Sequence, residues 1–146
     1  MIFNPPKKIK NISWSKIKVG DSVDFSAVIR QSDIDSFIKF SGDINPMHIE
    51  QSFAVARGFK QPIVHGMLAA SFFSTLVGTY LPGLNNLYIS QEVKFKKPIF
   101  VGERLKVVGK VKRKIESVKT IYLETLIYNP KGQVAVEGQA IVKYLS

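Results

Sequence analysis

Residues 62–80 read PIVHGMLAASFFSTLVGTY, and no Asp, Glu, Lys or Arg occurs between Gln61 and Gln91. About 20 apolar residues would suffice to cross a membrane. Here, however, four hydroxyl residues dilute the run, Pro82-Gly83 ends it, and no second apolar span follows. The pattern instead favours a helix that is apolar on nearly all sides because the rest of the protein surrounds it.

The chain after this helix has the alternation of apolar and polar residues that is typical of β-strands. Strands are expected within 86–100, 103–115, 120–128 and 133–145, with the turn NPKG between the last two. These runs exceed the usual strand length of about 5–6 residues, which favours a large curved sheet. One face of an antiparallel sheet can contact solvent. The apolar face is expected to hold Leu87, Ile89, Val93, Phe95, Leu105, Val107, Val111 and Ile115, and the polar face Tyr88, Ser90, Glu92, Lys94, Lys106, Lys110, Lys112 and Lys114.

The chain before the helix contains one strand and two shorter helices. Residues 22–29 alternate as a strand. Ser32 with Asp35 three residues later resembles a capping box, so we expect a helix from this point to a stop at Gly42. A second short helix is expected to end at Gly58.

A sheet can hide one fully apolar helix by curling around it, which is the hotdog architecture. The predicted fold is therefore α+β, with a long antiparallel curved sheet wrapped around a central apolar helix. A chain of 146 residues suits one domain. We expect residues 1–146 to form it, with residues 1–19 as an N-terminal extension of the same domain.

Composition narrows the chemistry and the partners. The chain has no cysteine, which excludes disulfides, thiolate catalysis and Cys-based zinc sites, and its two histidines alone make a poor metal shell. The formal charge of +10 suits nucleic acid, an anionic membrane surface or a phosphate-bearing ligand. Lys outnumbers Arg by 17 to 4, which disfavours sequence-specific reading of DNA bases. The termini show no secretory, retention or lipidation signal, so a cytoplasmic location is expected.

The stretch FSGDINPMHI at residues 40–49 places Asp43 and His48 on either side of an Asn-Pro turn. Pro46 fixes its own φ and favours an extended Asn45, whose side chain can bond the local backbone. Alone, Asp43 would be read as a turn residue and His48 as a loop histidine. Together on a stiff turn they can project into one cavity, where a carboxylate and an imidazole supply general acid–base catalysis.

The same stretches resemble a known family. FSGDINPMHIEQSFA resembles the signature of the MaoC-like hydratases, and PIVHGMLAASFFSTLVGTYLPG looks like the central helix of that family. LYISQEVKFKKPIFVGERL is similar to its following strand and connection. The resemblance runs from about residue 20 to the C-terminus and is strongest to the short, single-hotdog R-specific enoyl-CoA hydratases.

This resemblance implies a hydro-lyase that adds water reversibly, in syn fashion, to a trans-2-enoyl-CoA to give an (R)-3-hydroxyacyl-CoA. Asp43 and His48 would be the catalytic pair, and the Gly66 N–H would bind the thioester oxygen. A donor in the first turn of a helix is free for such a role. Ser74 would support the site further along the helix. Asn45, Pro46 and His65 would support it structurally, without proton transfer.

The resemblance also implies an acyl-CoA substrate with coenzyme A as part of it, no metal or prosthetic group, and a homodimer joined through sheet edges. Neither nucleic acid nor membrane is expected as a partner. Acyl carrier protein is the alternative carrier, which would make the protein a 3-hydroxyacyl-[acyl-carrier-protein] dehydratase. Two further candidate functions are a hotdog thioesterase and a non-catalytic basic binding module. The nucleotide end of the substrate could rest near Lys94, Lys96, Lys97 and Arg104.

Overall fold

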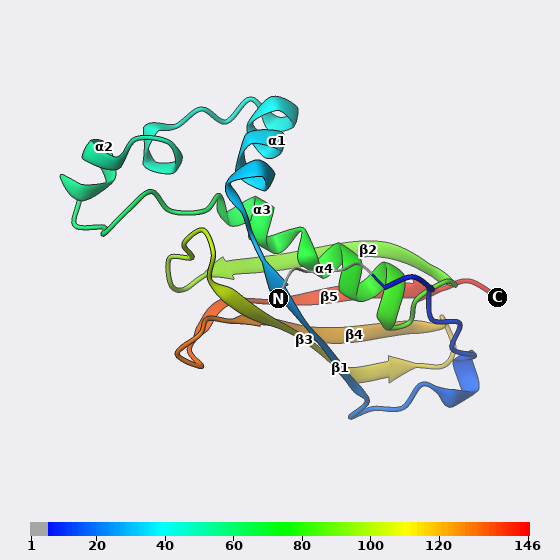
Figure 1. The fold of residues 1–146 in the computed structure, drawn as a ribbon. Coiled ribbons are helices and arrows are strands. Elements are labelled where there is room, and N and C mark those ends of the chain that lie inside the picture. The colour runs from blue at the N-terminus through cyan, green and yellow to red at the C-terminus, as the bar shows by residue number, and fades with distance from the viewer. Residues whose placement is uncertain (1–5) are drawn as a thin grey trace.

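A computed structural model describes residues 6–146 and contains a five-stranded antiparallel sheet that curls around a helix (Figure 1). The strand order is β1-β3-β4-β5-β2, so β1 and β2 form the two edges. The predicted hotdog fold is thus confirmed. The strands are β1 (Ser22–Val28), β2 (Asn86–Phe95), β3 (Arg104–Ile115), β4 (Thr120–Tyr128) and β5 (Val134–Tyr144).

Three consecutive helical segments form one run over residues 66–80, here called the central helix. They are α3 (Gly66–Ala70), α4 (Phe72–Thr75) and η3 (Leu76–Tyr80). The remaining segments are η1 (Trp14–Lys16), α1 (Gln31–Ser41), η2 (Pro46–His48) and α2 (Gln51–Val55). The helices α1 and α2 lie beyond one end of the sheet, next to the start of the central helix (Figure 1).

The central helix packs closely into the concave face of the sheet. Phe73 is 1% exposed, and Leu76 and Val77 are fully buried. Gly109 on β3 makes this approach possible, because a Cβ at that position would lie 2.5 Å from Leu76 Cδ2. No helix within residues 6–146 has both the length and the apolar character needed to cross a membrane.

One face of the central helix is open, contrary to the prediction that protein surrounds it on nearly all sides. Met67 is 63% exposed, and Ser71 and Ser74 are also exposed. A single curled sheet covers only the side of the helix that faces it. The exposed face thus carries two serines as well as Met67, and nothing within residues 6–146 covers it.

The start of α1 differs from the prediction. The N-cap is Arg30, and the Arg30 N–H donates to Asp33 Oδ2 at 2.8 Å. The capping side chain is therefore Asp33, not the predicted pair of Ser32 and Asp35. The predicted end is confirmed, because Gly42 adopts φ +75° and its N–H donates to Ile38 O at 2.9 Å.

The predicted faces of β2 are wrong before its bulge, whereas Ser90, Glu92, Val93 and Lys94 lie on the predicted faces. The register with β5 shifts between Tyr88 and Ser90, and this bulge reverses the alternation. Leu87 and Ile89 are exposed, whereas Tyr88 packs against the core. Burial raises the pKa of Tyr88 to about 12, so its phenol stays protonated and donates to Gln91 Oε1. Of the four predicted apolar positions on this strand, only Val93 packs against the core.

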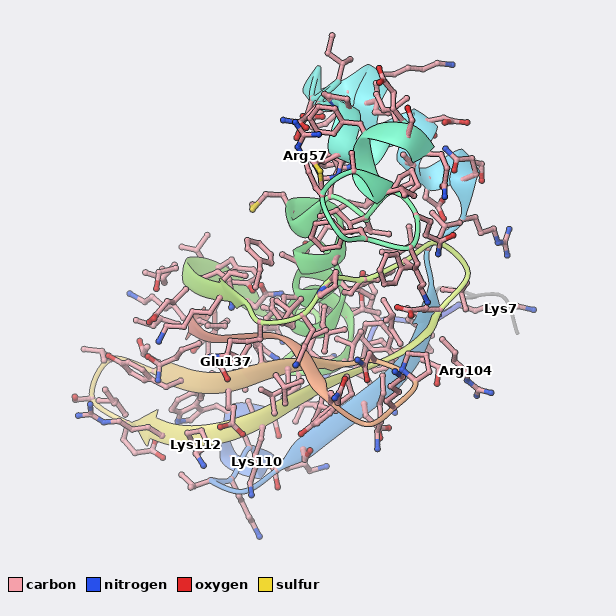
Figure 2. All side chains as sticks on the ribbon, turned by 90° about the vertical axis from the view of Figure 1, so that its left-hand side faces the viewer. Lys7, Arg57, Arg104, Lys110, Lys112 and Glu137 are labelled. Atoms are coloured by element: carbon pink, nitrogen blue, oxygen red, sulfur yellow. The ribbon has the colours of Figure 1, made fainter. Side chains whose placement is uncertain are left out.

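The basic stripe on β3 lies on the solvent face, with one exception. Lys110 and Lys112 point away from the central helix (Figure 2). A register shift between Val111 and Arg113 then turns Lys114 the other way. Lys114 is 13% exposed, and its Nζ donates to Trp14 O at 3.0 Å. The prediction that Lys114 belongs to the outer face is wrong because simple alternation does not anticipate a bulge.

The described part of the N-terminal extension packs on the same core as the rest of the chain. Ile17 is 1% exposed, and the Trp14 ring lies 5.6 Å from the Tyr144 ring. The Lys10 N–H donates to Thr79 O at 2.9 Å. The predicted domain span of 1–146 includes residues 1–5, which lie outside the described residues.

Candidate active site

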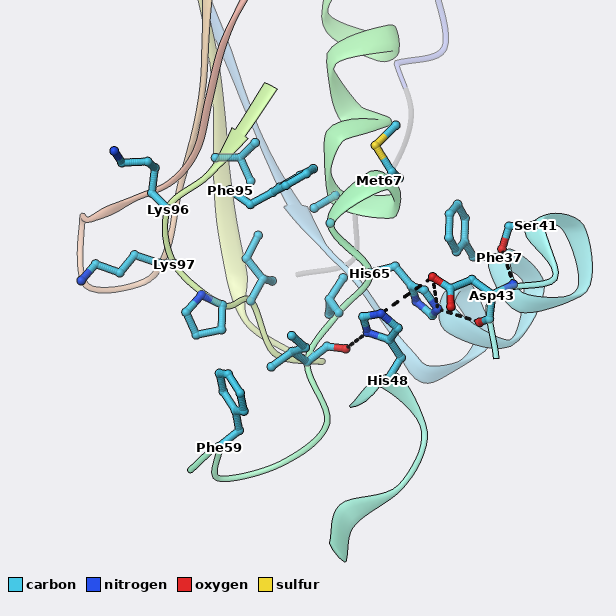
Figure 3. A pocket seen from close by; sticks show the side chains of 17 residues that line it. Phe37, Ser41, Asp43, His48, Phe59, His65, Met67, Phe95, Lys96 and Lys97 are labelled. Carbon is cyan, nitrogen blue, oxygen red and sulfur yellow. Dashed lines mark hydrogen bonds and ion pairs between the residues drawn. The ribbon is translucent and has the colours of Figure 1, made fainter. Parts of the chain in front are cut away.

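A cavity of about 590 Å³ opens where three parts of the chain meet (Figure 3). These parts are the turn after α1, the first turn of the central helix and the segment at the end of β2. Asp43, His48, His65 and Gly66 all line this cavity. The fold therefore brings together four of the residues that the sequence singled out.

Hydrogen bonds within the turn fix its shape. Asp43 Oδ1 accepts from the Asn45 N–H at 3.1 Å, and Asn45 Oδ1 accepts from the Met47 N–H at 3.0 Å. Asn45 has φ −57° and ψ 129°, the extended geometry expected before Pro46. The Asn-Pro pair therefore starts the short helix η2, and His48 is the last residue of that helix.

The catalytic candidates face each other across a short gap. His48 Nε2 lies 3.9 Å from Asp43 Oδ2, which is too far for a direct hydrogen bond. His48 Nδ1 lies 2.8 Å from Ile63 O, and a carbonyl oxygen only accepts, so Nδ1 carries the proton. With its proton on Nδ1, the neutral form of the His48 ring presents the lone pair of Nε2 toward Asp43. The His48 side chain is 15% exposed and that of Asp43 is 48% exposed.

The first turn of the central helix supplies the third group. The helix begins at Gly66 with His65 as N-cap, so the Gly66 N–H precedes any intrahelical acceptor. Within residues 6–146 this N–H has no hydrogen-bond partner. A Cβ on Gly66 would lie 2.8 Å from the Phe95 ring. Any larger residue at this position would therefore displace the Phe95 ring.

His65 and Ser74 are placed very differently. The His65 side chain is 2% exposed and lies directly behind the pair, with Nε2 3.1 Å from Asp43 O. Ser74 lies two turns beyond Gly66 on the exposed face of the helix and does not line the cavity. The structure does not bring Ser74 to the other four residues, and its supporting role stays a prediction.

Asp43, His48 and His65 offer three possible metal-ligand atoms within 4.8 Å of one another. The donor set does not fit a metal ion well. The His65 Nε2–H is committed to Asp43 O, and the ring of His65 stacks on that of His48 with centroids 3.8 Å apart. Stacked rings direct their in-plane lone pairs side by side and not toward a common point.

The four basic residues considered as contacts for the nucleotide end of the substrate do not all lie at the cavity. Lys96 and Lys97 line the cavity mouth (Figure 3). Lys94 instead lies 3.8 Å from Glu92, and Arg104 lines a separate hollow beside Asn129 and Pro130. Lys96 Nζ is 3.8 Å from Glu137, whereas no acidic group within residues 6–146 lies within 4.0 Å of Lys97 Nζ.

Sequence reasoning missed the aromatic lining of the cavity. Phe37 comes from α1, Phe59 from the loop after α2 and Phe95 from the end of β2. It also missed Ile63, whose backbone carbonyl orients His48. This contact is made by a backbone carbonyl 15 residues away, and because every residue has such a carbonyl, the residue type at position 63 does not indicate it. The aromatic residues were visible in the sequence, but only the fold brings them together.

The comparisons with known proteins agree with this architecture. The MaoC like domain model matches residues 13–128. The chain is 37% identical over 132 residues to the (R)-specific enoyl-CoA hydratase of Aeromonas caviae, covering 90% of this chain and 98% of that protein. It is 36% identical to the (R)-specific enoyl-CoA hydratase of Rhodospirillum rubrum, covering 88% and 89%. A solved R-hydratase from Pseudomonas aeruginosa superposes with a TM-score of 0.86 at 31% identity, covering 93% and 87%. The chain belongs to the MaoC-like domain family.

Proposed function

We propose that this protein is an R-specific enoyl-CoA hydratase, which adds water reversibly to trans-2-enoyl-CoA to give (R)-3-hydroxyacyl-CoA. The observation that carries this proposal is the pair of Asp43 Oδ2 and His48 Nε2, two acceptors 3.9 Å apart beside a cavity. The (R)-specific hydratases among the relatives support the same substrate class.

One water molecule can bridge the pair. It would donate one hydrogen to the Asp43 carboxylate and the other to His48 Nε2, so that a lone pair of its oxygen faces the substrate. Both side chains are acceptors in the tautomer that Ile63 O sets, so each can accept one of the two hydrogens of the water. Positioned general acid–base groups of this kind contribute about 10²–10⁴-fold to the rate.

The reaction then proceeds through an enolate. The water oxygen bonds to C3 while one O–H bond breaks and its proton passes to Asp43. The C2=C3 electron pair moves toward the thioester carbonyl, and the Gly66 N–H donates to the developing oxyanion. Such a donor contributes on the order of 3–4 kcal/mol in comparable sites. The proton that Asp43 took up then passes to C2 from the face that holds the water, which makes the addition syn and returns Asp43 to the carboxylate.

The cavity mouth suits the phosphate-bearing end of coenzyme A. Lys96 and Lys97 lie at the mouth, while the acid–base pair lies on the other side of the cavity (Figure 3). Because Lys97 has no acidic neighbour within 4.0 Å among the described residues, its charge is available to a ligand. The reaction itself uses no metal or prosthetic group in this proposal.

Assembly as a homodimer is part of the same proposal. Among the described strands β2 pairs only with β5, so its other edge is open. Leu87 and Ile89 on β2 are 50% and 54% exposed, and Met67 on the nearby helix is 63% exposed. Pairing two β2 edges would satisfy the open backbone groups and place the strand of a second chain beside Leu87 and Ile89.

Substituting the pair tests the activity. Asp43→Asn should leave the fold intact, because Asn is nearly isosteric and also suits a turn. It should still lower kcat for hydration of crotonyl-CoA by about 10²-fold or more, because the proton acceptor is lost. His48→Gln should do likewise, and the double variant should lose less than the product of the two losses, because both residues serve one water. Loss of absorbance of the conjugated thioester measures the rate.

Control measurements separate the candidate functions. Release of free thiol from crotonyl-CoA would indicate a thioesterase. Full activity of Asp43→Asn would contradict the proposed role of the turn. Salt-sensitive DNA binding by a wild-type protein that does not hydrate crotonyl-CoA would favour the basic binding module.

Neutralising the cavity mouth tests the substrate. Lys97→Gln should raise KM for crotonyl-CoA about two- to fivefold, the range expected for an exposed ion pair, with kcat unchanged. Added salt should shrink the difference from wild type, because it screens the same attraction. Lys112→Gln removes an equal charge from the solvent face of the sheet and serves as the matched control. Equal effects of the two substitutions would show that only overall charge matters.

Sedimentation equilibrium tests the assembly. At micromolar concentration the expected mass is twice the chain mass of 16.4 kDa. Ile89→Glu should shift the protein toward the single-chain mass, because it places a charge at the proposed contact. A wild-type mass of one chain would rule out the dimer.

A further inference from the structure

His65 contacts both members of the proposed catalytic pair although it is almost completely buried. Its side chain is 2% exposed, and Nε2 lies 3.1 Å from Asp43 O and 4.0 Å from Asp43 Oδ2. On its other side, its ring stacks against that of His48 (Figure 3). No other residue of the described chain is shown to contact the two in this way.

The hydrogen bond to Asp43 fixes the backbone from which the carboxylate projects. A carbonyl oxygen only accepts, so His65 Nε2 must donate, and the ring is the Nε2–H tautomer. This bond joins residues 22 positions apart in the sequence. It therefore ties the turn after α1 to the start of the central helix.

The ring stack fixes the direction of His48. The two imidazole centroids are 3.8 Å apart with an interplanar angle of 27°, and Phe37 packs 4.9 Å from the His65 centroid. His48 is thus held at its edge by Ile63 O and across its face by His65. Both contacts are needed to aim Nε2 at Asp43, because a hydrogen bond alone leaves the ring free to tilt.

The environment of the second ring nitrogen of His65 is evidence against a purely structural role for this residue. His65 Nδ1 is buried and has no hydrogen-bond partner among residues 6–146. An unpaired buried acceptor lowers stability, so packing alone does not favour an imidazole at this position. The burial of Nδ1 also prevents direct proton exchange with a substrate in the cavity.

From these contacts we infer that His65 is a positioning residue for the hydration step, and this inference rests on the proposed function. It sets the gap between Asp43 Oδ2 and His48 Nε2 by holding the backbone of one and the ring of the other. Because His65 is also the N-cap residue immediately before Gly66, it links this gap to the oxyanion donor. One side chain thereby fixes the relative positions of the Asp43 carboxylate, His48 Nε2 and the Gly66 N–H.

Two substitutions test separately the hydrogen bond of His65 to Asp43 O and its ring stack on His48. His65→Phe keeps a ring for the stack and removes the donor to Asp43 O, whereas His65→Gln keeps a donor and removes the ring. Each should lower kcat for crotonyl-CoA about 10- to 100-fold, because small misplacements of reacting groups are costly, and KM should stay within about threefold. Circular dichroism and thermal unfolding would verify that the variants fold.

A double-mutant cycle distinguishes positioning from general stabilisation. In a His48→Gln background, His65→Gln should cost at most about threefold more, because the ring that the His65 stack positions is already gone. A full and independent loss in that background would overturn the inference. So would wild-type kcat in both single variants, while inactivity of the wild-type protein on crotonyl-CoA would instead refute the proposed function.

The wild-type protein offers a test that does not depend on any variant folding. Nitrogen-15 NMR of the imidazole rings should show His65 protonated at Nε2 alone and His48 protonated at Nδ1 alone. A His65 ring protonated at Nδ1 would be unable to donate to Asp43 O from Nε2 as a neutral side chain. That result would contradict the inference directly.

Discussion

The burial of one helix against a curved sheet is the constraint on which the rest of the molecule depends. Phe73, Leu76 and Val77 have almost no exposed surface, and burying each such side chain contributes about 1.5–3 kcal/mol. Gly109 lets Leu76 settle onto the sheet, where any Cβ would collide with it. Because this contact is so close, the position of the helix start is determined by the packing of its C-terminal half.

The position of the helix start in turn creates the site. Gly66 opens the helix with a free N–H at the cavity, and the preceding His65 reaches back to the turn that carries Asp43 and His48. Asn45 and Pro46 stiffen that turn through local hydrogen bonds and a restricted φ. The proposed reaction therefore depends on two rigid segments, the turn after α1 and the start of the central helix, with the buried His65 ring between them.

Much of this could be predicted from residue order. The uncharged run between Gln61 and Gln91 and the long alternating strands indicated a helix wrapped by a sheet, and the spacing of Asp43 and His48 indicated the pair. The bulges next to Ile89 and Lys112 could not be predicted, because one unpaired residue reverses the alternation without changing composition. The contacts of His65 with Asp43 O and of His48 with Ile63 O were also hidden, since they involve backbone carbonyls remote in sequence.

The stereochemistry of addition tests the central claim most directly, because a water held by Asp43 and His48 can reach only one face of the alkene. Crotonyl-CoA would be hydrated in D2O, and the configuration of the product at C2 and C3 would be determined by proton NMR. The account predicts (R)-3-hydroxybutyryl-CoA with a single deuterium at C2, added on the same face as the hydroxyl. An S product would contradict the proposed R specificity. Deuterium at C2 on the face opposite the hydroxyl, or on both faces, would contradict a site in which one pair holds the water and returns the proton.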